Sequence, residues 1–70
     1  MGPTIGRIVH YKITEKEVRP AIIVKVHSET CVNLQVFYDG GNDAALSPIG
    51  MVWKTSIVQG NGVGEWQWPR

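Results

Sequence analysis

Apolar residues in this chain recur at every second position, which is the pattern of β-strands and not of helices. The clearest stretch alternates three aliphatic side chains with two amides: Val32, Asn33, Leu34, Gln35 and Val36. This alternation predicts a strand whose aliphatic side chains face the core while Asn33 and Gln35 face outward. Because no segment has the helical period over a useful length, we expect an all-β fold with no substantial helix.

Five short strands are predicted in all. They cover residues 5–12, 21–27, 31–38, 51–56 and 65–68. The segment 21–27 is the most apolar and is rich in β-branched residues, so we expect it to be a central strand. Residues 14–19 are polar and precede Pro20, which predicts a surface loop or a hairpin connection there. Residues 39–50 and 59–64 are rich in glycine and in Asn, Asp or Pro, and are predicted to be loops.

The length of 70 residues limits the chain to one small domain, residues 1–70, with a small core. Strands this apolar need a second layer, which a strongly bent sheet provides by folding over on itself. We therefore predict a small SH3-like barrel of about five antiparallel strands. Cys31 is the single cysteine and makes no intrachain disulfide, so self-association into a homo-oligomer is the expected source of further stability.

The charge balance limits the class of partner. Seven Lys and Arg residues against six Asp and Glu residues give a net charge of +1, which argues against a strongly basic nucleic-acid clamp. No apolar run approaches the roughly 20 residues of a membrane span. The first four residues lack the basic and apolar regions of a secretion signal, so we expect an intracellular protein away from membranes.

Four segments carry a resemblance to a known group of proteins. They are GRIVHY (residues 6–11), RPAIIV (19–24), CVNLQVF (31–37) followed by DG (39–40), and GEWQWP (64–69). In these segments the chain resembles small proteins encoded in the genomes of tailed bacteriophages. The resemblance implies a viral accessory protein that acts in the host cytoplasm, and it assigns no chemistry and no functional residue.

Catalytic and metal-binding patterns are weak. Cys31 and His27 would form an activated pair only with an orienting group and an oxyanion donor, and the sequence suggests neither. The candidate ligands of a metal site are His10, His27 and Cys31, with Asp39 or Asp43 as the fourth. They lack the short paired spacings of zinc motifs. We therefore expect no enzyme activity, no metal and no cofactor.

The three tryptophans are the most informative side chains. Trp66 and Trp68 share one strand face by parity, and one of these two or Trp53 is expected to fill the core. The remainder either pack against another subunit or form a platform on which a flat ligand such as a nucleobase stacks. The predicted ligand site combines these rings with nearby amides and charges: Trp53, Lys54, Trp66, Trp68, Asn42, Asp43 and Arg19.

Two functions are therefore predicted ahead of a third. The first is a non-catalytic accessory protein that binds a small nucleotide-type ligand in aromatic-lined pockets of a homo-oligomer; the resemblance to phage accessory proteins implies that this binding sequesters a host immune signal. The alternative is a protein-interaction or virion-assembly module that docks through its tryptophan face. Weak nucleic-acid binding ranks third because of the low charge.

Overall fold

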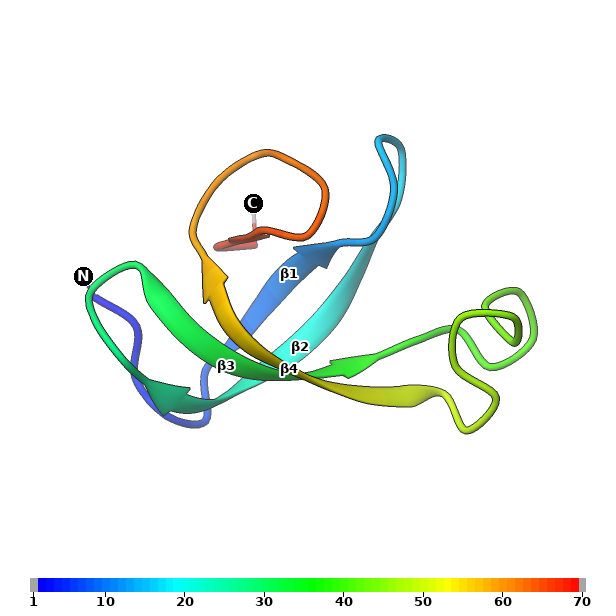
Figure 1. Ribbon diagram of the computed structural model, residues 1–70, viewed down its shortest axis with the longest axis horizontal. Helices are drawn as coiled ribbons and strands as arrows, with labels where there is room; N and C mark the ends of the chain where they lie inside the picture. Colours follow the sequence, from blue (N-terminus) through cyan, green and yellow to red (C-terminus); the bar gives the residue numbers. More distant parts are fainter. Residues whose placement is uncertain (1, 70) are drawn as a thin grey trace.

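The computed structural model describes residues 2–69, which form a single antiparallel β-sheet and contain no helix (Figure 1). The strands are β1 (Ile8–Lys12), β2 (Val18–Val26), β3 (Cys31–Phe37), β4 (Met51–Val58) and β5 (Trp66–Gln67). They lie in the order β4-β3-β2-β1-β5. The prediction of an all-β fold with five antiparallel strands is confirmed, as is the central position of the strand that contains residues 21–26.

The start of β2 differs from the prediction. Residues 14–19 were expected to be a surface loop or a hairpin connection; a hairpin connection is present, but it is shorter, because Val18 and Arg19 already pair with β1, opposite Lys12 and Tyr11. A tight turn brings the strands together, with the Glu17 carbonyl accepting the N–H of Ile13 at 3.0 Å. Proline is tolerated at position 20, the third residue of β2, because it pairs with His10 of β1 only and pairing with β3 begins one residue later.

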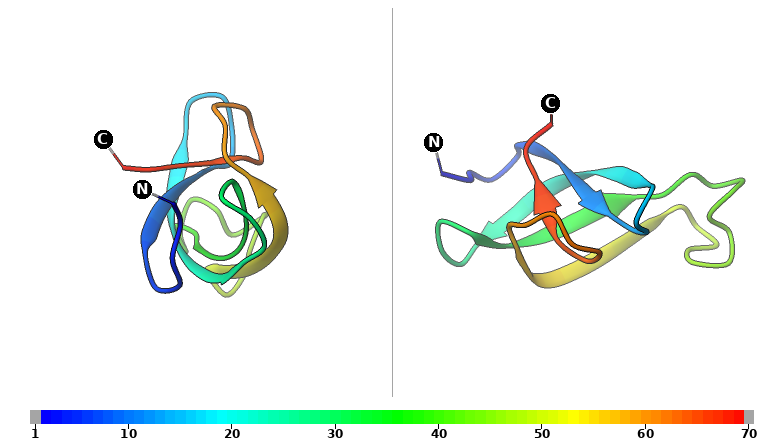
Figure 2. Two further views of the ribbon diagram at one scale, coloured as in Figure 1. Left: turned by 90° about the vertical axis from the view of Figure 1, so that its left-hand side faces the viewer. Right: turned by 90° about the horizontal axis from the view of Figure 1, so that it is seen from above.

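The core lies on the concave side of the sheet, which curls strongly when viewed along the long axis of the molecule (Figure 2). Its buried apolar members come from β1, β2, β3 and β5: Val9, Tyr11, Ala21, Ile23, Val32, Leu34, Val36 and Trp66. On β1, β2 and β3 they follow the predicted period of two. Trp66 fills the place that was expected for one of the three tryptophans.

Asn33 was predicted to face outward with Gln35, yet it is buried at 8% exposure, while the aliphatic residues Val32, Leu34 and Val36 keep the predicted inward face. The pairing register shifts on both sides of this residue, between Ile23 and Lys25 on β2 and between Val32 and Leu34 on β3. The shift toward β4 places two residues, Thr55 and Ser56, opposite the single residue Asn33. The amide oxygen of Asn33 accepts hydrogen bonds from two β4 groups at this shift, the Thr55 hydroxyl and the Ser56 N–H.

The sheet is not a closed barrel, because β4 and β5 stand at its two edges. Within residues 2–69 they are linked by an isolated parallel bridge between Gln59 and Trp66. The indole N–H of Trp66 also donates to the carbonyl of Thr30 at 3.0 Å, which ties β5 to the turn before β3. The described part of the chain holds no helix long and apolar enough to cross a membrane.

Candidate ligand site

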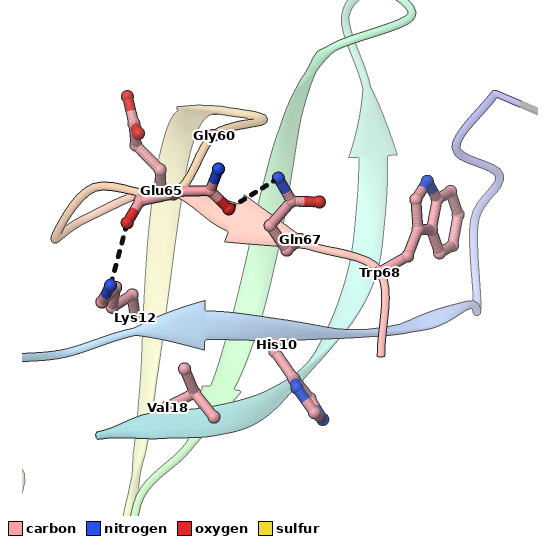
Figure 3. Close-up of a pocket in the computed structure, with 8 residues that line it drawn as sticks. His10, Lys12, Val18, Gly60, Glu65, Gln67 and Trp68 are labelled. Atoms are coloured by element: carbon pink, nitrogen blue, oxygen red, sulfur yellow. Dashed lines mark hydrogen bonds between the residues drawn. The ribbon is translucent and has the colours of Figure 1, made fainter. Parts of the chain in front are cut away.

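A hollow of about 300 Å³ lies beside β1, β5 and the β4–β5 loop, residues 59–65 (Figure 3). Val18, Gly60 and Trp68 complete a lining in which five of the eight residues have polar side chains: His10, Lys12, Asn61, Glu65 and Gln67. His10 faces Gln67 directly across the β1–β5 ladder. Lys12 lies two residues beyond His10 and so shares its face of β1.

The β4–β5 loop is held in place by the same side chains that line the hollow. The Lys12 ammonium donates to the Asn61 carbonyl at 2.9 Å, and the Gln67 amide donates to the Asn61 side-chain oxygen at 3.1 Å. The Glu65 carboxylate turns back into the loop and accepts the N–H of Gly62 at 2.8 Å. The hollow therefore has a largely fixed rim, which is typical of small-ligand sites.

Trp68 stands between this hollow and a second one. Its ring meets Trp66 edge to face, with centroids 5.3 Å apart and planes at 88°. The Arg7 guanidinium lies 5.4 Å from the centroid of the Trp68 ring, in the range of a cation–π contact. The second hollow, of about 450 Å³, is lined by Arg7, Ile8, Trp68 and Pro69. Trp68 is thus a partly exposed aromatic wall shared by two recesses.

The charge around Trp68 favours an anionic group. Arg7 and Lys12 bring two positive charges, and His10 adds an imidazole beside them. Among the described residues, Glu65 is the only one with a carboxylate that lines either hollow. One of its oxygens accepts the backbone N–H of Gly62. A ligand with a flat ring and an acidic group matches this combination.

The seven residues of the predicted ligand site are not brought together. Trp68 lines both hollows, but Trp66 is fully buried and presents no surface to a ligand. Trp53 is 56% exposed on β4, and Lys54 places its ammonium 6.0 Å from the Tyr11 ring centroid. Neither residue lines a hollow beside Trp68. Both lie on β4, a different strand, and as successive residues they point to opposite faces of the sheet.

The other three predicted residues form a separate cluster at the base of the β3–β4 loop, residues 38–50. The Arg19 guanidinium donates two hydrogen bonds to the Asp43 carboxylate, of 2.6 Å and 3.0 Å. These bonds hold the pKa of the Asp43 carboxyl below its ordinary value. Asn42 donates its side-chain amide to Asp39 at 2.9 Å. The side chains of this cluster are engaged with one another and fix the loop.

Sequence reasoning missed His10, Lys12, Asn61 and Gln67 as site residues. His10 and Gln67 are separated by 57 positions and meet only because β5 pairs with β1 in one register. The available signal was the outward parity of His10 and Lys12 in the first predicted strand. That parity marks two exposed polar residues and does not say which distant strand they face.

Cys31 and the two histidines do not assemble a reactive or metal site in the described chain. His27 places its Nε2 2.9 Å from the Asn33 amide oxygen. Within residues 2–69, no group of three or more His, Cys, Asp or Glu side chains is placed to hold a metal ion.

Comparison with known protein families, with curated proteins and with solved structures finds no match to this chain.

Proposed function

We propose that this chain is a non-catalytic binding module that takes a small nucleotide-type ligand beside Trp68. The observation that carries the proposal is the position of Trp68, an aromatic wall between two recesses that also present Arg7, Lys12 and His10. Stacking of one base on an aromatic side chain contributes about 1–3 kcal/mol. The first hollow, at about 300 Å³, matches the lower end of the usual size of ligand pockets.

The polar groups suit the remaining parts of a nucleotide. The amides of Asn61 and Gln67 present donors and acceptors that complement a base edge or a sugar hydroxyl. The ammonium of Lys12 and the guanidinium of Arg7 complement a phosphate. A module of this kind acts by stoichiometric capture, which is how it would sequester a host immune signal.

The finer architecture and setting are part of the same proposal. The strand order β4-β3-β2-β1-β5 and the bridge from Gln59 to Trp66 support an SH3-like barrel that is incompletely closed. The resemblance to proteins of tailed bacteriophages supports an accessory role in the host cytoplasm. The small size of the domain supports a homo-oligomer.

Calorimetric titration and thermal shift with a panel of linear and cyclic nucleotides test the proposal. Binding raises the melting temperature, because a ligand that binds the folded state adds stability that grows with the logarithm of its excess over Kd. We expect one class of nucleotide to bind, Trp68→Ala and His10→Ala to weaken it at least about tenfold, and Trp53→Ala to leave it unchanged. His10→Ala keeps the test decisive if loss of Trp68 disturbs Trp66. A panel without any binder, or equal loss with Trp53→Ala, would refute the site.

The alternative function, a module for protein interaction or virion assembly, is favoured by a different observation. Trp53 is 56% exposed and lies in a cross-strand row with Gln35, Ile22 and Ile8 on the outer face of the sheet. Exposed tryptophans are frequent hot spots of protein interfaces. Loss of a protein partner with Trp53→Ala, while Trp68→Ala retains that partner, would select this alternative. Weak nucleic-acid binding stays third because the net charge is +1.

A further inference from the structure

The β4–β5 loop contains an asparagine followed directly by a glycine, Asn61 and Gly62, and both residues are exposed. A backbone nitrogen can attack the side-chain amide of the asparagine before it and expel ammonia. Glycine has no Cβ, so no side chain shields the nitrogen of Gly62 from the Asn61 amide. The other two asparagines lack this combination, because Asn33 is buried and precedes a leucine, and Asn42 precedes an aspartate.

The Glu65 carboxylate lies against the attacking group. The backbone N–H of Gly62 donates to Glu65 Oε1 at 2.8 Å. The carboxylate is packed so closely into the loop that a Cβ at Gly62 would stand 2.9 Å from Oε1, and a Cβ at Gly60 would clash with it. A carboxylate in this position is placed to accept the proton that the nitrogen loses as it attacks.

Gln67 lies against the group that is attacked. Its side-chain amide donates to Asn61 Oδ1 at 3.1 Å, so an N–H points at the oxygen on which negative charge develops during attack. The Lys12 ammonium donates to the Asn61 main-chain carbonyl at 2.9 Å and holds the same residue in place (Figure 3). A base, a nucleophile and an oxyanion donor are therefore assembled around one amide.

We propose that Asn61 and Gly62 form a self-modification site, at which Asn61 loses its side-chain nitrogen as ammonia with Glu65 as the base. The Gly62 nitrogen forms a bond to Asn61 Cγ, and its proton passes through the Glu65 carboxylate to the leaving amino group. The bond between Cγ and Nδ2 breaks, ammonia departs, and a cyclic succinimide remains. Water then opens the ring at either carbonyl, which gives aspartate or isoaspartate, and water is the only co-reactant.

The modification changes the hollow beside Trp68, and this consequence rests on the proposed function. Aspartate replaces an amide donor of the lining with a negative charge. In isoaspartate the chain continues through Cγ, so the former main-chain carbonyl of Asn61, which Lys12 contacts, becomes a carboxylate. Lys12 is then paired with a fixed anion and no longer complements a phosphate. Capture of an anionic ligand is therefore expected to weaken as the protein ages.

Peptide mapping by mass spectrometry tests the modification in the folded native chain, incubated at neutral pH. Cleavage after Lys54 releases residues 55–70, in which Asn61 is the single asparagine. We expect Asn61 to convert to aspartate and isoaspartate at least about tenfold faster than Asn33 or Asn42.

Two matched variants test the role of the carboxylate, with circular dichroism as the check on folding. Glu65→Gln keeps an acceptor for the Gly62 N–H and removes the base, so the conversion is expected to slow about threefold or more. Glu15→Gln is the same change at an exposed residue of the turn between β1 and β2, and should leave the rate unchanged. Conversion of Asn61 no faster than that of Asn42, or conversion that is as fast or faster in Glu65→Gln, would overturn the inference.

Ion exchange separates the fresh chain from the converted chain, and nucleotide titration of each measures the consequence for capture. We expect the converted chain to bind at least about tenfold more weakly, and equal binding would overturn the loss of capture. The peptide map needs no ligand, so it decides the modification even where no nucleotide binds. Failure of the modification and failure of the ligand site are thereby distinguished.

Discussion

Arg19 and Asp43 join the start of β2 to the β3–β4 loop through a two-bond ion pair between residues 24 positions apart. The guanidinium Nε and Nη2 donate to the two carboxylate oxygens at 2.6 Å and 3.0 Å. The same carboxylate accepts the backbone N–H of Asp39 at 2.8 Å. One buried aspartate therefore ties a strand to both ends of a loop turn.

This pair predicts a specific loss of stability in acid. The bonds from Arg19 lower the pKa of Asp43 in the folded protein, so at acidic pH the unfolded chain binds more protons than the folded one. The stabilisation is complete above the ordinary aspartate pKa of about 3.9 and is lost as the pH falls through the lower folded value. We expect Asp43→Asn to lower the urea midpoint at neutral pH and to flatten its decline below about pH 4.

Asp39→Asn is the matched control, because hydrogen bonds from Asn42 and Gly41 also lower the pKa of Asp39. It removes a carboxylate from the same loop and leaves the Arg19 pair in place. Urea titrations at several pH values compare the two variants with the native chain. An acid profile that is the same in native and Asp43→Asn protein would contradict the assignment.

A second prediction concerns Asn33, whose amide oxygen accepts the N–H of Ser56 at 2.9 Å and the hydroxyl of Thr55 at 3.0 Å. Ser56 has a φ of 55°, which is unfavourable for a residue with a side chain. Asn33→Ala leaves the Ser56 N–H without its acceptor, so we expect a loss of about 1–3 kcal/mol in the free energy of unfolding. Gln35→Ala on the same strand is the control and should cost clearly less; equal losses in the two variants would refute this role.

Asn33 also shows where sequence reasoning stopped. The alternation of residues 31–37 predicted β3 and its three buried aliphatic residues, because a period of two is a local property. The register shifts at Val24 and Asn33 depend on how two strands meet, and no local pattern encodes them. Pro20 led the prediction to begin this strand too late, at residue 21. A proline usually ends a strand, but here it is accommodated near the start of β2.

The site was harder to predict than the strands for the same reason. Trp68 was singled out by composition and parity, and it does line both hollows. Arg19 and Asp43 are polar residues of the kind that bind ligands, yet each is the other's partner. Only the three-dimensional arrangement shows that these two charges are paired with each other and do not face a hollow.

A third prediction separates the tryptophans by stability. Trp66 is fully buried and its indole N–H is bonded to Thr30, whereas Trp53 is 56% exposed. Trp66→Ala removes a large core side chain and is expected to cost about 3–5 kcal/mol, enough to unfold a marginal domain. Trp53→Ala should shift the unfolding midpoint little. Urea denaturation followed by circular dichroism measures both, and a Trp53→Ala loss as large as that of Trp66→Ala would contradict the placement of the core.

The last prediction concerns the open edge of the sheet. β4 is an eight-residue edge strand, MVWKTSIV, whose single charge is Lys54. Lys54 lies opposite the buried Leu34, and its ammonium stands near the Tyr11 ring, so the charge points to the concave side. An inward-pointing lysine on an edge strand hinders pairing with a strand from another chain, because such pairing would bury the charge further.

Lys54→Val is therefore expected to leave the fold intact and to increase aggregation, measured as the rate of rise in static light scattering at fixed concentration. Lys25→Val is the matched control, since it removes the same charge from β2 at a residue that pairs with Asn33 of β3, away from the open edge of β4. Equal aggregation of the two variants would show that net charge, and not the open edge, governs solubility. Faster aggregation of Lys54→Val alone would assign to Lys54 the protection of β4, the function that its inward orientation predicts.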